Sequence, residues 1–513
     1  MRYAAESMRL MRECGEVKWC PLEGSKIADF YKGKSVFVTG ATGFLGKLVV
    51  EKLLRACPDL DTVYILVRPK KGEDAHSRID KLYSDEIFGP LTKLFPKFVH
   101  KISVMKGDAS LPDLGLSPAD RATIIEKVNV FFHVAATVRF DEKMTVATAI
   151  NVRGTRDLLQ IAAKCKNLEA FVHVSTAYTN CNQKEICEAF YKPPIRADEL
   201  IEMVEKTPEK IVLDETVRLI GDWPNTYTFT KAVAEDAVRV YGKGLPVCVV
   251  RPAVVIATYK EPLRSWIDNL YGATGIVVGA GTGLLKTMHC DSSKTAELVP
   301  GDYVINHMIA ASYQTAIEKP KEIPIYNYVS SVENHHTWRD FMHQCSTWGE
   351  ELPTIRCVWY YTLTMNRFYY VHVLYRIFLH YLPALLMDLG MILARKPPMM
   401  MKIYKKITKF ESVISHFSTN EWKFHNTNTQ DLWNSLTKAD RKMFPFSMKE
   451  LSWDEYYKTH TLGLRQYVVK DDISTLPQAM VKWRRFYIAN KAIKTIFYIV
   501  ILYLVYSFLS RLL

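Results

Sequence analysis

The sequence predicts an α/β protein with a Rossmann-type, doubly wound parallel sheet, a mainly helical C-terminal domain and a C-terminal transmembrane helix. A short apolar strand at 36–38 runs into the glycine-rich turn 39–46, and an amphipathic helix follows the turn. Further apolar runs alternate with helical patterns, as expected for a parallel sheet with helices on both faces. These runs lie at 63–67, 102–105, 128–134 and 171–174. An uncharged apolar run near the C-terminus is the third observation.

The turn after the first strand is a candidate dinucleotide-binding loop. Glycines let the backbone approach a pyrophosphate, which then sits on the N-terminus of the following helix. A glycine pattern alone is weak, and this one gains weight from the catalytic pair described below. The candidate cofactor-binding residues of the turn are Thr39, Gly40, Thr42, Gly43, Phe44, Leu45 and Gly46.

The end of the second strand indicates which nicotinamide cofactor binds. NAD enzymes usually place an acid there to hold the ribose 2′-hydroxyl. This chain has Arg68, with Lys70 and Lys71 behind it. Because a guanidinium pairs with a 2′-phosphate, we expect NADPH. The alternative is a solvated basic turn.

The third and fourth strands add candidate cofactor contacts at the same sheet edge. Asp108 follows the third strand, where its carboxylate would accept a hydrogen bond from the adenine amino group. Ala135 and Ala136 follow the fourth, and their small side chains would let the cofactor lie against the backbone. His133, within that strand, is interpreted as a core histidine.

The fifth strand and a later helix predict the catalytic groups. Ser175 and Thr176 follow the strand at the edge where ligands bind such sheets. Tyr227 and Lys231 are four residues apart and share one helix face. We expect the Lys231 ammonium to lower the pKa of the phenol and to hold the nicotinamide ribose. The phenol would then protonate a carbonyl oxygen that a Thr176 or Ser175 hydroxyl holds. An ordinary surface pair is the alternative interpretation.

These residues belong to longer segments that carry a family resemblance over nearly the whole chain. The segments are 38–46, 132–142, 174–178, 224–231, 251–252, 266–269, 299–306 and 382–384 with Asp388. Through them the chain resembles the fatty acyl-CoA reductases, an extended short-chain dehydrogenase family that makes primary alcohols. It departs from the family at Arg264-Ser265, where the family usually has Pro-Gly, and at Gly301, where it usually has valine.

The resemblance implies a reaction and a role for each catalytic residue. A long-chain fatty acyl-CoA would be reduced by NADPH to a hemithioacetal, which expels CoA and leaves an aldehyde. A second NADPH would reduce the aldehyde to the alcohol. Tyr227 would donate the proton, and Lys231 would adjust the pKa of Tyr227. Thr176, or less favourably Ser175, would orient the oxygen. Asn151 matches a position that is usually structural in the superfamily.

Composition agrees with a large intracellular enzyme. The chain has 513 residues, 48% of them hydrophobic, which is enough for an α/β domain and a second unit. Its ten cysteines show no Cys-x-x-Cys spacing, so we expect neither a metal site nor a disulfide framework. Residues 1–20 lack the apolar core of a signal peptide. No nucleic-acid-binding module accompanies the net charge of +13.

The C-terminal end predicts attachment to a lipid bilayer. Residues 495–510 carry no charge and lie between Lys494 and Arg511. As a helix they would span roughly 24 Å, short of a ~30 Å hydrocarbon core, but the flanking cations can snorkel. The basic residues Lys482, Arg484, Arg485 and Lys491 favour a cytosolic catalytic domain. The endoplasmic reticulum is the favoured membrane and the peroxisome the alternative; a buried terminal helix is the other interpretation.

The pattern divides the chain into five parts. They are an N-terminal extension (1–31), an NADPH-binding reductase domain (32–330), a helical C-terminal domain (331–465), a basic linker (466–491) and the anchor (492–511). Residues 357–392 are interpreted as an acyl-chain tunnel, a bilayer-surface segment or a plain helical core. Four lysines at helical spacing form a basic face: Lys402, Lys405, Lys406 and Lys409. This face would contact lipid headgroups, bind the phosphates of CoA or simply be solvated.

Two other functions stay open on the sequence. Another extended short-chain dehydrogenase, such as a sterol-type dehydrogenase or a sugar-nucleotide epimerase, would share Tyr227 and Lys231. A membrane-tethered scaffold that binds NADPH without catalysis is the non-enzyme alternative.

Overall fold

The architecture was analysed in a computed structural model that describes residues 2–14, 23–69 and 75–512. Within these residues, seven parallel strands form the main sheet, in the order β11-β7-β5-β4-β1-β2-β3. The strands are β1 (Ser35–Thr39), β2 (Val63–Val67), β3 (Ile102–Lys106), β4 (Val128–His133), β5 (Ala170–Val174), β7 (Val247–Pro252) and β11 (Ile325–Tyr328). This order confirms the predicted Rossmann-type sheet, and its strand order reverses next to β1.

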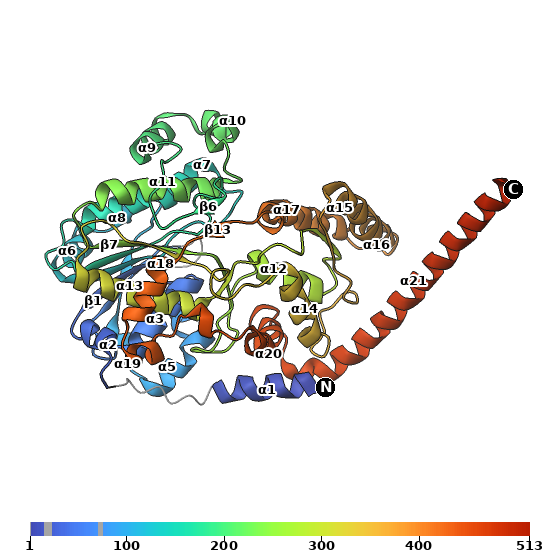
Figure 1. The fold of residues 1–513 in the computed structure, drawn as a ribbon, viewed down its shortest axis with the longest axis horizontal. Helices are drawn as coiled ribbons and strands as arrows, with labels where there is room; N and C mark the ends of the chain where they lie inside the picture. Colours follow the sequence, from blue (N-terminus) through green and yellow to red (C-terminus); the bar gives the residue numbers. More distant parts are fainter. Residues whose placement is uncertain (1, 15–22, 70–74, 513) are drawn as a thin grey trace.

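Helices cover both faces of the sheet (Figure 1). One face carries α3 (Phe44–Ala56) and α13 (Gly301–Glu318), and the other carries α6 (Pro118–Lys127), α8 (Gly154–Ala162) and α11 (Thr226–Tyr241). Alternate residues of β1 enter opposite cores: Val36 and Val38 pack with Leu48 of α3, and Phe37 packs with Leu158 of α8. The strands are buried on both sides, which explains their continuous apolar runs.

Short helices extend the second face. α9 (Ala197–Lys206) and α10 (Glu209–Ile220) pack near α11, and Val212 and Leu200 join Phe229 in one cluster. An interrupted helix precedes α8, consisting of α7 (Met144–Ala147) and a π-helical turn at Thr148–Arg153. This turn contains Asn151 and lies against α11.

The C-terminal part is mainly helical but is tied to the sheet domain. Small parallel pairs join the two parts: β12 (Thr364–Asn366) pairs with β9 (Thr287–His289), and β13 (Lys423–Phe424) pairs with β6 (Glu185–Ile186). α18 (Thr427–Ser435) packs on β11, and α19 (Lys438–Met443) packs on α2 (Lys26–Tyr31). Other helices of this part are α14 (Trp338–Gly349), α15 (Tyr369–Arg376), α16 (Leu382–Leu393), α17 (Met400–Thr419) and α20 (Trp453–Gly463), and α4 (Ala75–Tyr83), α5 (Gly89–Leu94) and α12 (Gly272–Gly281) belong to the sheet domain.

Both chain ends are helical. α1 (Arg2–Cys14) packs on α20, and the rest of the predicted extension includes residues 15–22, which lie outside the described part. α21 (Leu476–Leu512) is one continuous helix, so residues 476–491 of the predicted linker and the anchor share it. Among the described residues, two helical segments are long and apolar enough to cross a membrane: Tyr369–Leu393 and Ile473–Arg511. The apolar window of the second has no buried residue, and α21 projects away from the body in Figure 1.

Candidate active site

The predicted glycine turn forms a close-fitting loop between β1 and α3. Gly40 has φ +74°, and a Cβ there would lie 2.8 Å from the Ala135 backbone nitrogen. A Cβ on Gly46 would lie 2.1 Å from the Gly40 carbonyl oxygen. Gly43 is the N-cap of α3 and supplies no side-chain cap. The first N–H groups of α3 therefore receive no side-chain cap, and a helix N-terminus of this kind fits the pyrophosphate of a dinucleotide.

Thr39 has a supporting role in this loop. Its hydroxyl is fully buried, hydrogen-bonds to His133 Nδ1 at 2.8 Å and accepts from the Ala135 N–H at 3.2 Å. His133 Nε2 pairs with Thr155 Oγ1 at 2.9 Å, and burial lowers the pKa of His133 to about 3. His133 is therefore the neutral core histidine expected from the sequence, and it holds the ends of β1 and β4 together.

The predicted 2′-phosphate edge contains a second arginine that sequence reasoning missed. The exposed side chain of Arg68 lies 3.8 Å from Asp108 Oδ2. Arg78 of α4 (Ala75–Tyr83) donates to the Arg68 carbonyl and to Thr42 Oγ1, the latter at 2.9 Å. Asp108 also accepts two hydrogen bonds from Ser110. The guanidinium of Arg78 thus reaches the backbone of Arg68 where β2 ends.

The other predicted cofactor residues follow β1 and β4. Ala135 and Ala136 are partly exposed after β4. Phe44 stacks on Trp266 with centroids 5.5 Å apart, and Leu45 packs against the larger core. Lys70 and Lys71 lie outside the described residues.

Tyr227, Thr176 and Lys231 meet at the carboxyl end of β5. The Tyr227 ring stacks on Phe140 with a centroid distance of 5.5 Å, and its hydroxyl hydrogen-bonds with the Thr176 side chain. Lys231 is buried one helical turn later and donates to the Val174 carbonyl at 2.7 Å. Asn225 caps α11 by accepting from the Thr228 N–H at 2.9 Å, which fixes where the helix begins.

The pKa values of the pair differ from the sequence expectation. Burial raises the pKa of Tyr227 to about 12, and only the hydrogen bond with Thr176 opposes this shift. Burial lowers the pKa of Lys231 to about 8, against the attraction of Glu235. The expected lowering of the phenol pKa by Lys231 is therefore not found, because the ammonium points to the Val174 carbonyl. At neutral pH the phenol carries its proton, as a proton donor must.

Ser175 has a different environment from Thr176. Its hydroxyl donates to Glu235 Oε1 at 2.6 Å and pairs with Thr179 Oγ1 at 2.9 Å. The Ser175 hydroxyl is therefore engaged in this network, whereas the Thr176 side chain lies at Tyr227. Glu235 is a residue that the sequence pattern did not single out.

Asn151 supports the catalytic helix from the π-helical turn. Its Oδ1 accepts from the Thr137 N–H, and its Nδ2 donates to Thr230 Oγ1 of α11, each at 2.9 Å. Thr230 lies directly before Lys231. The buried Asn151 amide therefore positions α11, in agreement with the structural role expected for it.

Comparison with known proteins identifies the family. Models described as male sterility protein match residues 38–308, the NAD-binding part, and residues 379–471. The Drosophila melanogaster protein "Fatty acyl-CoA reductase wat" is 41% identical over 488 residues, covering 95% of this chain and 94% of the relative. This chain belongs to the fatty acyl-CoA reductases. Human "Fatty acyl-CoA reductase 1" is 37% identical over 514 residues, covering 94% of this chain and 98% of the relative.

Solved structures share the fold of this reductase. The terminal reductase domain of a myxalamid biosynthetic pathway has a TM-score of 0.53 at 20% identity, covering 91% of this chain and 98% of that domain. A reductase domain of a non-ribosomal peptide synthetase from Mycobacterium tuberculosis has a TM-score of 0.54 at 17% identity, covering 90% and 95%. The family membership makes this chain an oxidoreductase with a nicotinamide-dinucleotide-binding domain.

The two departures from the family pattern make different contacts in this reductase. Ser265 is fully buried at φ +56°, a conformation that favours glycine, and its hydroxyl pairs with Thr459 at 2.8 Å. Arg264 pairs with Glu455 at 3.0 Å. A Cβ on Gly301 would lie 2.9 Å from the Phe44 ring, so this glycine makes room for Phe44.

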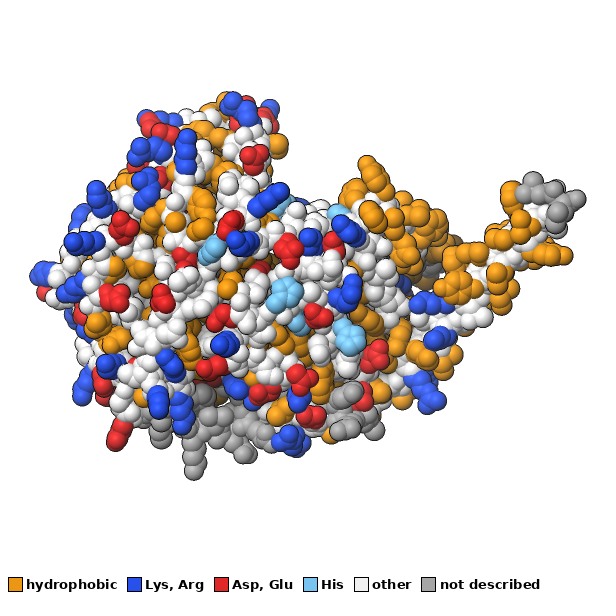
Figure 2. Space-filling view, viewed as in Figure 1, with side chains coloured by type: hydrophobic (Ala, Val, Ile, Leu, Met, Phe, Trp, Pro, Cys, Tyr) orange, Lys and Arg blue, Asp and Glu red, His pale blue; other side chains and the backbone are white. Residues whose placement is uncertain are grey.

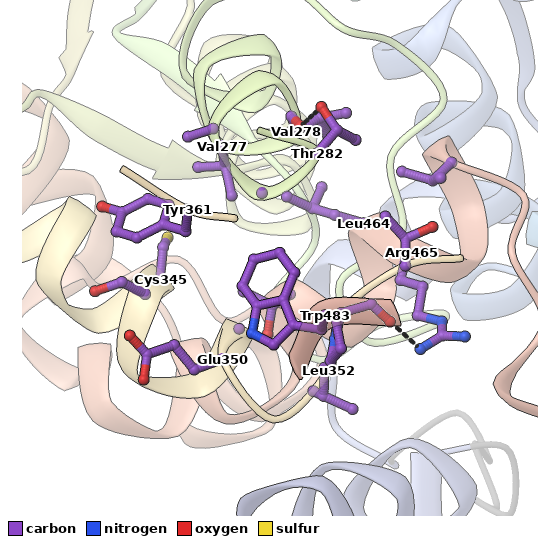
Figure 3. A pocket seen from close by; sticks show the side chains of 18 of the residues that line it. Val277, Val278, Thr282, Cys345, Glu350, Leu352, Tyr361, Leu464, Arg465 and Trp483 are labelled. Atoms are coloured by element: carbon purple, nitrogen blue, oxygen red, sulfur yellow. Dashed lines mark hydrogen bonds between the residues drawn. The ribbon is translucent and has the colours of Figure 1, made fainter. Parts of the chain in front are cut away.

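The reductase also has an apolar cavity of about 80 Å³ between α12, α14 and α21 (Figure 3). Val277, Cys345, Leu464 and Trp483 of α21 line it. No predicted site residue lines the cavity, and of residues 357–392, all within the described part, only Tyr361 does. The segment 357–392 therefore contributes only Tyr361 to the wall of this cavity.

Proposed function

We propose that this reductase converts a long-chain fatty acyl-CoA to a primary alcohol and CoA with two molecules of NADPH. The observation that carries the proposal is the meeting of Tyr227, Thr176 and Lys231 at the sheet edge that also bears the glycine loop. The acyl-CoA substrate follows from the names of the relatives.

The residues at the nucleotide edge fit NADPH. The loop of Gly40, Gly43 and Gly46 leaves room for a pyrophosphate against the α3 N-terminus. Arg68 and Arg78 would hold the 2′-phosphate, and Lys231 the nicotinamide ribose. NADPH, when bound, supplies the hydride.

The chain's own groups handle the oxygen that gains charge. Thr176 orients the thioester carbonyl oxygen, and Tyr227 gives it a proton as the carbon receives hydride. The resulting hemithioacetal loses its C–S bond, releasing CoA thiol and an aldehyde. In a second round the aldehyde carbon would receive a hydride from a second NADPH while Tyr227 protonates its oxygen, and the primary alcohol would leave.

We also propose that α21 anchors the enzyme in a membrane, with the catalytic domain in the cytosol. Its apolar part is exposed throughout, as lipid contact requires. Basic residues precede the apolar part, as the positive-inside bias predicts for a cytosolic side: Lys482, Arg484, Arg485 and Lys491. The endoplasmic reticulum is the favoured membrane and the peroxisome the alternative.

The test uses the full chain in phospholipid vesicles with palmitoyl-CoA and NADPH. We expect palmityl alcohol (hexadecanol) as the product. The rate of its formation should be about 10²- to 10⁴-fold lower in Tyr227→Phe, because one positioned proton donor contributes that much. NADPH binding, measured by fluorescence, should persist in this variant. Tyr241→Phe is the matched control, because it lies on the same helix and its hydroxyl pairs with Asp198 instead.

Two results would count against the proposal. NADPH binding without turnover of any acyl-CoA would support a scaffold. Full activity in Tyr227→Phe would remove this residue from the chemistry.

A further inference from the structure

The helical segment Tyr369–Leu393 has an inverted distribution of polarity. It comprises α15, a π-helical turn at Ile377–Tyr381 and α16, which follow one another without a break. Large apolar side chains recur every fourth residue on its outer face, and Tyr370 is 86% exposed. This outer face comprises Tyr370, Leu374, Phe378, Leu382 and Leu386. A water-soluble helix shows the opposite arrangement, with its apolar side turned inward.

The polar residues of the segment point into the protein. His372, His380 and Asp388 are all buried and are spaced eight residues apart. His380 Nε2 accepts from the Lys286 backbone N–H at 2.9 Å. Asp388 accepts three backbone N–H bonds at 2.8–2.9 Å from residues 399–401, which start α17. His372 Nδ1 pairs with Thr287 Oγ1 of β9 at 3.3 Å. Hydrogen bonds thus hold the start and the middle of the segment to residues 286 and 287, and its end to the start of α17.

An exposed apolar face of this length calls for a partner, because soluble monomers rarely leave such a surface in water. Figure 2 shows hydrophobic side chains gathered over α15 and α16, on the side of the molecule from which α21 projects. The patch therefore lies on the same side as the proposed membrane anchor.

Trp359 and Lys286, which lie outside this segment, link it indirectly to α21. Trp359 packs on Phe486 of α21 with centroids 5.5 Å apart and donates to Asn490 Oδ1 at 3.4 Å. The Lys286 ammonium lies 5.2 Å from the centroid of the Trp359 ring, and the backbone of Lys286 is bonded to His380. These contacts fix the position of the apolar face relative to α21. A bilayer into which α21 inserts would therefore also contact the apolar face.

Charges border the apolar face where lipid headgroups would lie. Arg395 and Lys396, directly after α16, are exposed, as are Lys402 and Lys405 of α17. Lys494 occupies the corresponding border on α21. Cations at the rim of an apolar face are typical of helices that lie in the interface of an anionic bilayer.

We infer that α15 and α16 form a second membrane-binding element, which lies in the plane of the bilayer and inserts its outer face into the leaflet that α21 enters. This inference rests on the proposed anchoring by α21. At about 1.5 Å per residue the segment is long enough to cross a bilayer, but its buried polar side is bonded to the body at both ends and in the middle. An in-plane position exposes the apolar side to lipid and keeps these hydrogen bonds.

A depth measurement on the full chain tests this inference. The environment-sensitive dye NBD is attached at Leu386→Cys in a Cys187→Ser background, because Cys187 is an exposed native cysteine. The protein is reconstituted in phosphatidylcholine–phosphatidylserine vesicles with or without doxyl-labelled lipids. Tyr503→Cys in α21 is the positive control, and Val217→Cys, on the exposed surface of α10, is the negative control. An unchanged thermal unfolding midpoint shows that each variant folds.

We expect blue-shifted emission and doxyl quenching at positions 386 and 503 and neither at 217. Quenching at 503 without quenching at 386 would overturn the second element and leave the anchor intact. Blue-shifted but unquenched emission at 386 would also overturn it, since that result indicates a second copy of the chain on the patch. No quenching at either site would refute both the anchor and this inference. The proposed acyl-CoA reduction is tested by a separate activity measurement, so it would not be affected by this result.

Discussion

Arg251 and Glu235 form a buried, bidentate ion pair behind the candidate active site. Arg251 Nε donates to Glu235 Oε1 at 2.8 Å, and Arg251 Nη2 donates to Oε2 at 2.6 Å. The same Oε1 accepts from Ser175. The pair therefore connects β7, α11 and the end of β5, which are the elements that bring Tyr227 and Thr176 together.

Removing the charge of Glu235 should destabilise the protein strongly. Glu235→Gln leaves the Arg251 guanidinium buried without its counter-ion, and breaking a buried pair in this way costs about 3–5 kcal/mol. The free energy of unfolding, measured with urea, should fall accordingly. Glu202→Gln is the control, because Glu202 forms an exposed pair with Lys206 on the surface. Equal effects of the two substitutions would show that the buried pair has no special structural role.

Arg68 and Arg78 should select NADPH over NADH. Each guanidinium can donate charge-assisted hydrogen bonds to a 2′-phosphate, worth about 1.5–3 kcal/mol. Arg68→Ala and Arg78→Ala should each raise the KM for NADPH roughly 10- to 100-fold. The KM for NADH is the internal control and should change little, since NADH lacks the phosphate. An equal rise in the KM for NADPH and for NADH would show that the arginines stabilise the loop and do not select the 2′-phosphate.

Local sequence patterns were sufficient to predict the sheet and the glycine loop. The apolar runs became strands within a residue or two, because burial on both faces leaves a continuous signal. The loop followed from glycines at positions where a Cβ would meet backbone. By contrast, Arg78 and Glu235 act through contacts with residues far along the chain, Thr42 and Arg251 among them. Periodicity carries no information about such partners.

The segment 357–392 shows a second limit of sequence patterns. Polar residues interrupt its apolar run. On the sequence alone, the segment could therefore be an acyl-chain tunnel, a segment on the bilayer surface or a plain helical core. The structure places His372, His380 and Asp388 on one buried side. The sequence shows which residues of a helix are polar. Which side of the helix faces the rest of the protein depends on the fold.

Gly46 should not tolerate a side chain. A Cβ there would approach the Gly40 carbonyl carbon to 2.6 Å as well as its oxygen, so the loop has to open. Gly46→Ala should therefore weaken NADPH binding by at least tenfold, because the pyrophosphate position depends on this loop. Fluorescence titration with NADPH measures the change. Gly89→Ala is the matched control, since a Cβ at Gly89 meets nothing within 4 Å, and normal binding in both variants would contradict the role of the loop.

The pH dependence of the reaction should report on Lys231. Its pKa is lowered to about 8 by burial, so the ammonium predominates below that pH and the neutral amine above it. Tyr227, with a pKa raised to about 12, keeps its proton throughout this range. If the ammonium holds the ribose hydroxyls, kcat/KM for NADPH should be level below pH 8 and fall roughly tenfold per unit above it. Steady-state rates measured across that range test the assignment, and a profile that rises through pH 8 would mean that the neutral amine is the active form.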